Sequence, residues 1–107
     1  MATKANIVLD QGTTFSSTIE LLDQNDEALD VSAYTARGQM RKHYSSTNSV
    51  SFSTSLSNGS LVISLTANQT ANIISGRYVY DLELINPSSQ VTRILEGIIT
   101  VTPEVTK

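Results

Sequence analysis

The last third of the chain reads as one long β-hairpin, and this pattern constrains the fold more than any other feature of the sequence. Large apolar residues stand at every second position from Tyr78 to Leu84, with mostly polar residues between them. This is the period-two pattern of a strand that has one buried face. Turn-prone residues follow at 86–89, and a second strand pattern runs over 90–101. The sequence therefore predicts two long antiparallel strands.

A four-residue loop at 86–89 predicts the register of this hairpin. It places Ile85 opposite Gln90 and Tyr78 opposite Gly97, and the two apolar faces then coincide. An aromatic ring over a strand glycine also fits the known compensation of a weak position in a sheet. The expected core face of the hairpin consists of Tyr78, Tyr80, Leu82, Leu95 and Ile99.

The opposite face of the hairpin carries apolar residues among charged ones. Val79, Ile94 and Ile98 point to the side that is expected to be wet. Two interpretations stay open, because single exposed apolar side chains are common, whereas a cluster on a sheet face is what a partner subunit would cover. Val79, Ile94 and Ile98 are therefore the candidate protein interface.

The rest of the chain continues the pattern of short strands. Apolar runs and alternation predict strands over the ranges 7–9, 14–22, 34–42, 50–54 and 61–65. If the strand over 34–42 lies beside the hairpin, its arginines form exposed cross-strand pairs with the hairpin's acidic residues. The small Ala36 and Gly38 leave room for a bulky neighbour across the core.

Two local motifs lie between these strands. Asn58-Gly59 predicts a tight hairpin turn. Thr66 and Gln69 have the spacing of a capping box, which predicts one short helix near residues 67–74. This helix is too short to be stable alone, so we expect it to lean on the sheets through Ala67, Ala71 and Ile74.

Strand number and spacing then indicate the fold. The sequence contains about seven to eight short strands and one short helix, and its strands do not alternate with helices as in βαβ units. This pattern predicts an all-β, immunoglobulin-like two-sheet sandwich. Tyr78 and Tyr80 fall in the tyrosine-corner region of such a fold. The length of 107 residues allows a single domain over 1–107, with residues 1–6 as a flexible arm.

Composition argues against most kinds of chemistry. The chain has no cysteine, and its net charge is −3 from 10 acidic and 7 basic residues, so we expect neither a thiol site nor a nucleic-acid partner. No apolar run approaches the roughly 20 residues of a membrane span. His43 lacks the pattern of a nucleophile and an orienting partner. The acidic stretch 23–30 departs from the calcium-loop register. We predict no catalytic, cofactor-binding or metal residues, and no small-molecule substrate.

Three stretches in a fixed order resemble a known family. They are residues 30–42 (DVSAYTARGQMRK), residues 64–71 (SLTANQTA), and residues 76–84 (GRYVYDLEL) followed by 93–106 (RILEGIITVTPEVT). Together they resemble small structural proteins of tailed bacteriophages and prophages, including versions in phages of marine cyanobacteria. The family is similar to the immunoglobulin-like N-terminal domain of phage baseplate upper proteins.

This resemblance implies a β-sandwich that serves as a virion building block or adaptor and has no active site. The implied partners are other virion structural proteins, with multiple copies per particle, and the implied location is the virion after synthesis in the host cytoplasm. The tail or baseplate is the first expectation for its position. A capsid or neck decoration protein is an alternative. A carbohydrate-binding adhesion module is another, for which Tyr44 would be the exposed aromatic residue.

Overall fold

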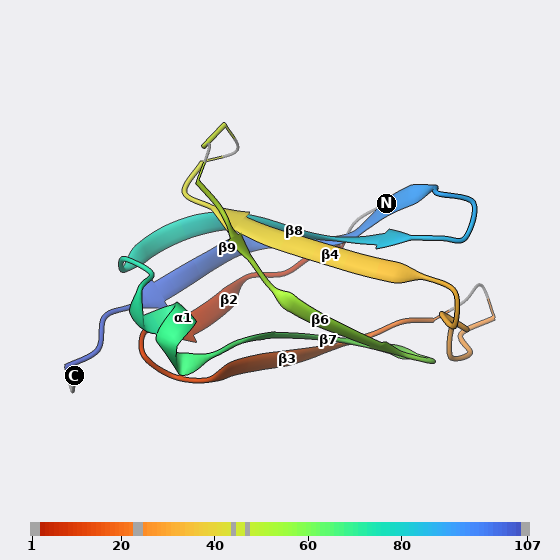
Figure 1. Ribbon diagram of the computed structural model, residues 1–107, viewed down its shortest axis with the longest axis horizontal. Helices are drawn as coiled ribbons and strands as arrows, with labels where there is room; N and C mark the ends of the chain where they lie inside the picture. Colours follow the sequence, from red (N-terminus) through yellow and green to blue (C-terminus); the bar gives the residue numbers. More distant parts are fainter. Residues whose placement is uncertain (1–2, 23–24, 44, 47, 106–107) are drawn as a thin grey trace.

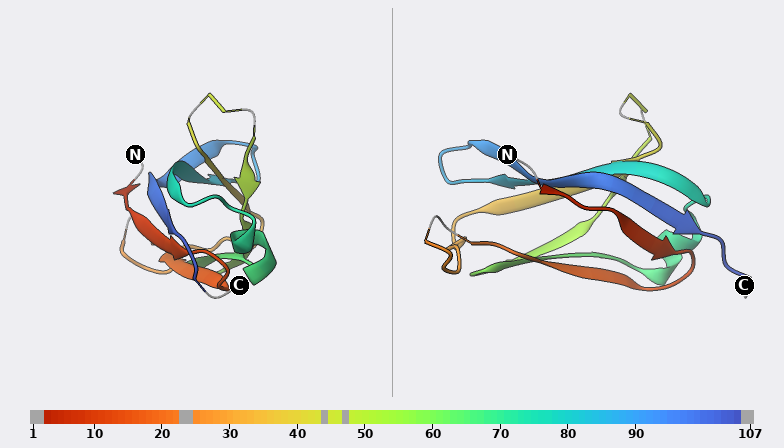
Figure 2. Two further views of the ribbon diagram at one scale, coloured as in Figure 1. Left: turned by 90° about the vertical axis from the view of Figure 1, so that its left-hand side faces the viewer. Right: turned by 180° about the vertical axis from the view of Figure 1, so that it is seen from behind.

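Two β-sheets lie face to face in the computed structural model, which describes residues 3–22, 25–43, 45–46 and 48–105 (Figure 1). The molecule measures 45 × 27 × 20 Å, and its strands run roughly along the longest axis (Figure 2). The described residues form nine strands and one helix, which confirms the predicted all-β sandwich. Within these residues, no helix is long and apolar enough to cross a bilayer.

The larger sheet is built around the terminal hairpin. β8 (Gly76–Ile85) pairs antiparallel with β9 (Val91–Thr102) on one side and with β4 (Thr35–Arg41) on the other. β5 (Val50–Ser51) pairs with β4 and extends this sheet by one short strand.

The N-terminal residues form the other edge of the large sheet. β1 (Thr3–Lys4) and β2 (Ile7–Asp10) run parallel to β9 in one continuous register. Between these strands, the Ala5 amide donates to the Glu96 carbonyl across 2.9 Å. The expectation of a flexible arm over 1–6 is therefore wrong from residue 3 onward, and residues 1–2 lie outside the described part of the chain.

The smaller sheet has the order β3-β7-β6. β3 (Phe15–Glu20) pairs antiparallel with β7 (Ser60–Leu65), and β7 pairs antiparallel with β6 (Ser53–Ser57). The turn between β6 and β7 is Asn58-Gly59, as predicted, with Gly59 at a φ of 86°. Phe52 stands between β5 and β6, where the chain crosses from the large sheet to the small one.

The strand order is that of an immunoglobulin-like sandwich. β3, β7 and β6 take the places of strands B, E and D, and β9, β8 and β4 take those of G, F and C. The Tyr78 hydroxyl, near the start of β8, donates to the Ile74 carbonyl across 2.6 Å. This backbone contact a few residues upstream is the tyrosine-corner interaction, and Tyr80 stands two residues on, where antibody domains carry a cysteine.

The core lies between the two sheets and comes mainly from alternating positions of the strands. Gly38 on β4 lies against Phe52 and Leu82, and a Cβ atom there would overlap the Leu82 side chain. The predicted room for bulky neighbours is thus confirmed. The largest fully buried side chains are those of Leu9, Met40, Leu61, Ile63, Leu65, Leu82, Ile99, Val101 and Thr70.

The terminal hairpin forms, but its loop is longer than predicted. Ile85 pairs with Val91, so the loop comprises the five residues 86–90. The Asn86 side chain closes it by accepting hydrogen bonds from the amides of residues 88 and 90, at 3.0 and 2.9 Å. The predicted pairing of Ile85 with Gln90 is therefore wrong by one residue.

A β-bulge in β9 shifts the register once more. Pairing is interrupted between Leu82 and Glu83, and Ile94 is the extra residue on β9. Beyond the bulge, Tyr80 and not Tyr78 faces Gly97. The predicted alternation places the correct residues of β8 in the core, but an unbroken alternation cannot represent the inserted residue.

The helix α1 (Ala67–Ala71) begins at the predicted cap. The Thr66 hydroxyl accepts from the Gln69 amide across 3.2 Å, and the Gln69 side chain accepts from the Thr66 amide across 2.8 Å. The capping box is therefore confirmed.

The inward face of α1 differs from the prediction. Thr70 and Ile73 are buried, whereas Ala71 is exposed and Ile74 is 78% exposed. The helix ends at its C-cap, Asn72, so the helical period does not continue to residue 74 as predicted.

Candidate protein interface

Three strands of the large sheet present their outward side chains in aligned rows. The pairings of β4 with β8 and of β8 with β9 place one residue of each strand in each row. We call these residues the outer face. Its rows are Arg41, Val79 and Ile98; Gln39, Asp81 and Glu96; and Arg37, Glu83 and Arg93.

The first row contains the apolar part of the outer face. Val79 on β8 pairs directly with Ile98 on β9, and Ile98 is 39% exposed. Val8 on β2 pairs with Thr100, the next outward residue of β9, and is 67% exposed. The predicted neighbours Val79 and Ile98 are thus brought together. Val8 joins them, which the sequence analysis missed because it did not pair β2 with β9.

Ile94 lies elsewhere, and its assignment to this patch is wrong. It is half-buried and packs against the core, in a slot with Ile19 and Leu84. The reason is the bulge at Ile94, because the extra residue does not follow the alternation that carries its neighbours outward.

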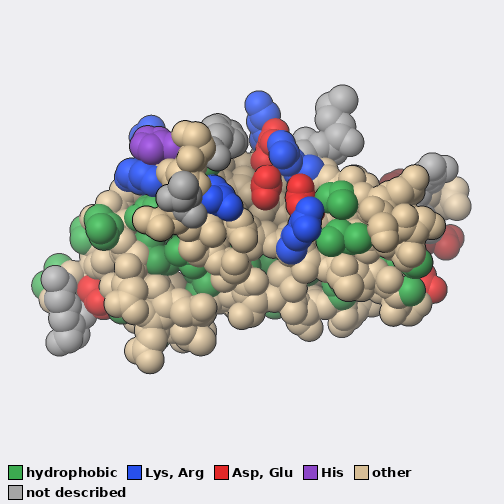
Figure 3. All heavy atoms as spheres, turned by 45° about the horizontal axis from the view of Figure 1, so that its top comes forward, with side chains coloured by type: hydrophobic (Ala, Val, Ile, Leu, Met, Phe, Trp, Pro, Cys, Tyr) green, Lys and Arg blue, Asp and Glu red, His purple; other side chains and the backbone are tan. Residues whose placement is uncertain are grey.

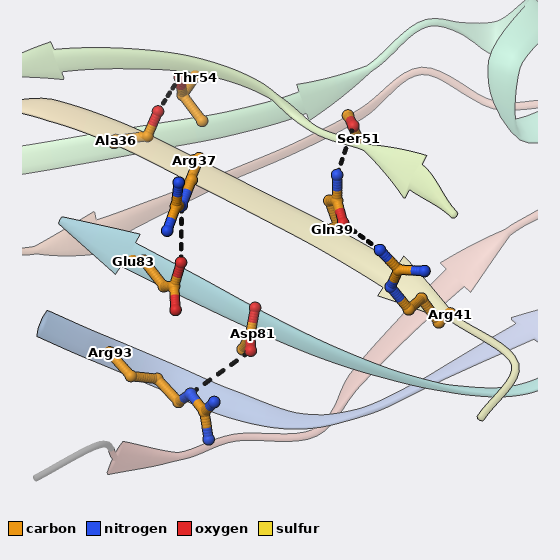
Figure 4. Close-up of polar contacts among 9 residues, drawn as sticks. All are labelled: Ala36, Arg37, Gln39, Arg41, Ser51, Thr54, Asp81, Glu83 and Arg93. Atoms are coloured by element: carbon orange, nitrogen blue, oxygen red, sulfur yellow. Dashed lines mark hydrogen bonds and ion pairs between the residues drawn. The ribbon is translucent and has the colours of Figure 1, made fainter. Parts of the chain in front are cut away.

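The third row and its neighbours are joined by ion pairs (Figure 4). Arg37 Nε lies 2.7 Å from Glu83 Oε1 across β4 and β8. Arg93 lies between two acidic residues, 3.4 Å from Asp81 Oδ2 and 3.1 Å from Glu96 Oε2. The predicted cross-strand pairing is confirmed for Arg37. Exposed pairs of this kind contribute only about 0.2–1 kcal/mol each.

Arg41 does not pair with an acidic residue as predicted. Its guanidinium donates to the Gln39 side chain across 2.9 Å and to the Ser46 carbonyl across 2.5 Å. Gln39 in turn donates to the Ser51 hydroxyl across 3.3 Å. A line of hydrogen bonds therefore crosses the sheet toward its β5 edge (Figure 4).

Asp81 on the outer face is subject to opposing electrostatic effects. Partial burial raises the pKa of its carboxyl, and the nearby Glu83 and Glu96 raise it further, while Arg93 and Arg37 lower it. Asp81 pairs directly with Glu96, and like charges directly opposite each other on a sheet are unfavourable. Arg93, which pairs with both carboxylates, offsets this repulsion.

The outer face is hollowed as well as charged. A depression of about 560 Å³ is lined by Arg37, Gln39, Arg41, Val79, Asp81, Glu83 and Arg93, among other residues. Figure 3 shows acidic and basic side chains gathered together on this side of the molecule, with hydrophobic side chains near them. This arrangement offers shape, an apolar row and fixed charges, but no nucleophile with an oriented base.

The remaining sequence candidates do not add up to a second site. His43 is exposed, and its amide donates to the Ser46 hydroxyl across 3.0 Å. Tyr44 and residues 23–24 lie outside the described part of the chain. No group of three or more metal-ligating side chains occurs among the residues whose positions are described.

Comparison with known proteins supports the fold alone. No protein-family model matches the chain, and no curated protein matches it. Its structure is similar to part of a solved structure, the Listeria monocytogenes internalin-like protein lmo2027, with a TM-score of 0.51 and 18% sequence identity. The match covers 94% of this chain and 28% of that one, so this chain spans less than a third of its structural neighbour.

Proposed function

We propose that this chain is a virion structural protein of a tailed bacteriophage, an assembly module that binds other virion proteins through its outer face. Two features support the proposal. One is the ordered resemblance to small phage structural proteins, which is carried by stretches between residues 30 and 106. The other is the outer face itself, an apolar row beside fixed ion pairs on a sheet that is broad enough to dock a partner.

The arrangement of the outer face indicates what the partner must supply. The exposed Val8 and Ile98 and the half-buried Val79 form an apolar strip, so the partner contributes apolar side chains that bury it. The rows beside that strip carry both acidic and basic side chains, so the partner contributes complementary charges there. In a particle, symmetry repeats this contact, so many copies of a small interface together give strong binding.

The observation that carries the proposal is the direct pairing of Val79 with Ile98 at the surface. Its test is Ile98→Glu, which places a charge in the strip, followed by measurement of incorporation into particles. We expect incorporation to fall at least about tenfold, as the loss of one well-buried interface residue would cause. Ile74→Glu is the matched control, because Ile74 is 78% exposed and precedes β8, outside the rows of the outer face. Equal incorporation of the Ile98 variant and the wild type would contradict the proposal.

Position within the particle is a separate part of the proposal. We favour the tail or baseplate, with the capsid or neck as the alternative. Fractionation separates the two, because the chain should copurify with tails and be absent from heads. A carbohydrate-binding function would instead require glycan binding that is lost in Tyr44→Ala.

A further inference from the structure

The outer edge of β3 carries backbone groups without a strand partner in the described part of the chain. The Leu21 amide donates to the Gly59 carbonyl across 2.9 Å, just beyond the pairing of Glu20 with Ser60. In an antiparallel pair, alternate residues bond to the same neighbour. Odd-numbered residues of β3 therefore bond to β7. The amides and carbonyls of Ser16, Thr18 and Glu20 point outward from the sheet edge.

The β6 and β5 edges of the sandwich are protected, unlike that of β3. On the far side of the small sheet, β6 lies against β4, and the Thr54 hydroxyl donates to the Ala36 carbonyl across 3.3 Å. The β5 edge of the large sheet has only two residues. β3 has six residues and contains no proline, lysine or arginine, the residues that commonly block edge pairing.

The fold has a vacant position beside β3. In an immunoglobulin-like sandwich, strand A pairs with strand B in the ABED sheet. Here β1 and β2 both pair with β9 instead, and the small sheet has the order β3-β7-β6, with no A strand among the described residues. A mostly apolar slot of about 320 Å³ lies at the end of β3; it is lined by Glu20 and by the apolar residues Ile19, Leu21, Leu22, Leu29, Leu84, Ile94 and Leu95.

We propose that a second copy of this chain fills this position, so that two β3 strands pair antiparallel about a two-fold axis at Thr18. This register pairs Thr18 with Thr18 of the second copy, and Ser16 with Glu20 on either side. All the outward backbone groups of Ser16, Thr18 and Glu20 are then satisfied. The two small sheets become one continuous sheet of six strands.

Charge and shape both favour this self-pairing. Glu20 lies opposite a serine, so no like charges meet, whereas a register shifted to bring Glu20 against Glu20 would be repulsive. On the inner side, the same register brings Phe15 of one copy beside Leu21 of the other. Phe15 is half-buried, and Leu21 lines the slot. The contact is isologous, which is the commonest arrangement of dimers. This inference concerns self-association and does not depend on the proposed place in a virion.

The first test compares two aspartate substitutions by sedimentation velocity. The wild type should form a species of twice the 11.6 kDa chain mass at high concentration. Thr18→Asp places two carboxylates face to face on the two-fold axis and should weaken the dimer at least about tenfold. Ser55→Asp is the matched control, because Thr18 and Ser55 both pair with Val62 and share one row of the small sheet. It should leave the dimer unchanged.

The second test identifies the register. Thr18→Lys should also dissociate the dimer, whereas an equimolar mixture of the Thr18→Asp and Thr18→Lys variants should restore it, because opposite charges then meet at the axis. Circular dichroism confirms that each variant is folded. A wild type that remains a single chain at concentrations up to about 1 mM would overturn the proposal. So would a dimer that Thr18→Asp leaves intact, or a mixture that fails to reassociate.

Discussion

Gly97 is a residue whose missing side chain holds two strands together. Tyr80 faces Gly97 across the hairpin, and the Tyr80 hydroxyl donates to the Ala5 carbonyl across 2.6 Å. A Cβ atom at position 97 would overlap the Ala5 carbonyl oxygen. The glycine therefore allows the N-terminal segment to dock on β9, and the tyrosine fastens it.

Gly97→Ala should loosen this docking. The added methyl group must displace backbone atoms, and overpacking of this kind typically costs about 1–3 kcal/mol. Urea unfolding measures the loss, and hydrogen exchange should show that the Ala5 amide loses protection, since it donates to the Glu96 carbonyl. Unchanged stability with full protection of Ala5 would contradict the close approach.

Tyr80→Phe should change the response of stability to alkali. Burial raises the pKa of the Tyr80 hydroxyl above its ordinary value of 10.0. As the pH rises, the unfolded chain therefore releases this proton before the folded chain does. The contribution of Tyr80 to the free energy of unfolding is fully present below its pKa in the unfolded chain. It is lost as the pH rises through its pKa in the folded chain. The variant should be less stable by about 0.5–1.5 kcal/mol at neutral pH, because a buried hydrogen bond is lost.

The difference in the free energy of unfolding between Tyr80→Phe and the wild type should become smaller above pH 10. Burial also raises the pKa of Tyr78, so the variant keeps part of the alkaline transition. Unfolding free energies measured between pH 7 and about 11 test this. If the free energies of unfolding of the two proteins changed with pH in parallel, the raised pKa of Tyr80 would be contradicted.

At the scale of the element, the bulge in β9 separates two isoleucines that the sequence makes look equivalent. Ile94→Glu should destabilise the fold by about 1–3 kcal/mol, because it places a charge against the core. Ile98→Glu should change stability by less than about 0.5 kcal/mol, because Ile98 is on the surface. Thermal unfolding of the two variants checks the contrast, and equal losses would refute the assigned bulge.

The cap of α1 is a second element-scale feature with a measurable effect. Thr66→Ala removes the acceptor for the Gln69 amide and should cost about 1 kcal/mol. Asn68→Ala is a fair control, because Asn68 is exposed on the same helix and its side chain has no part in the cap. Equal stability of the two variants would show that the capping box contributes little.

Local patterns predicted the elements well and their long-range pairing poorly. Alternation in β7 and β8, the Asn58-Gly59 turn and the Thr66 cap are properties of adjacent residues, and each is confirmed. The parallel pairing of β2 with β9 joins residues 92 positions apart, such as Ile7 and Ile99. No local pattern reports such a pairing. For this reason the sequence alone does not place Val8 beside Val79 and Ile98.

The candidate interface residues show the same contrast between local pattern and long-range pairing. The alternation of β8 and β9 beyond the bulge predicts the outward positions of Val79 and Ile98, and the pairing of the two strands confirms these positions. Ile94 was placed wrongly, because a bulge leaves no mark in the apolar pattern. The ion pair between Arg37 and Glu83 was predictable only once the strand over 34–42 was placed beside the hairpin.

For the whole molecule, the two proposed contacts use different parts of the sandwich. The outer face belongs to the large sheet, and the free edge of β3 belongs to the small sheet. Under the two proposals, one copy would bind a second copy and another virion protein at the same time. Such a division suits a repeated building block, because the two contacts can be strengthened or lost independently.

The measurement that tests the central proposal most directly is site-specific photo-crosslinking in intact particles of the tailed phage that we propose encodes this chain. A crosslinker at position 98 probes the outer face, and one at position 55 probes the opposite, outward face of the small sheet. We predict that position 98 crosslinks to a different virion protein and that position 55 does not. Absence of the chain from purified particles, or crosslinks to other virion proteins from position 55 alone, would contradict docking through the outer face.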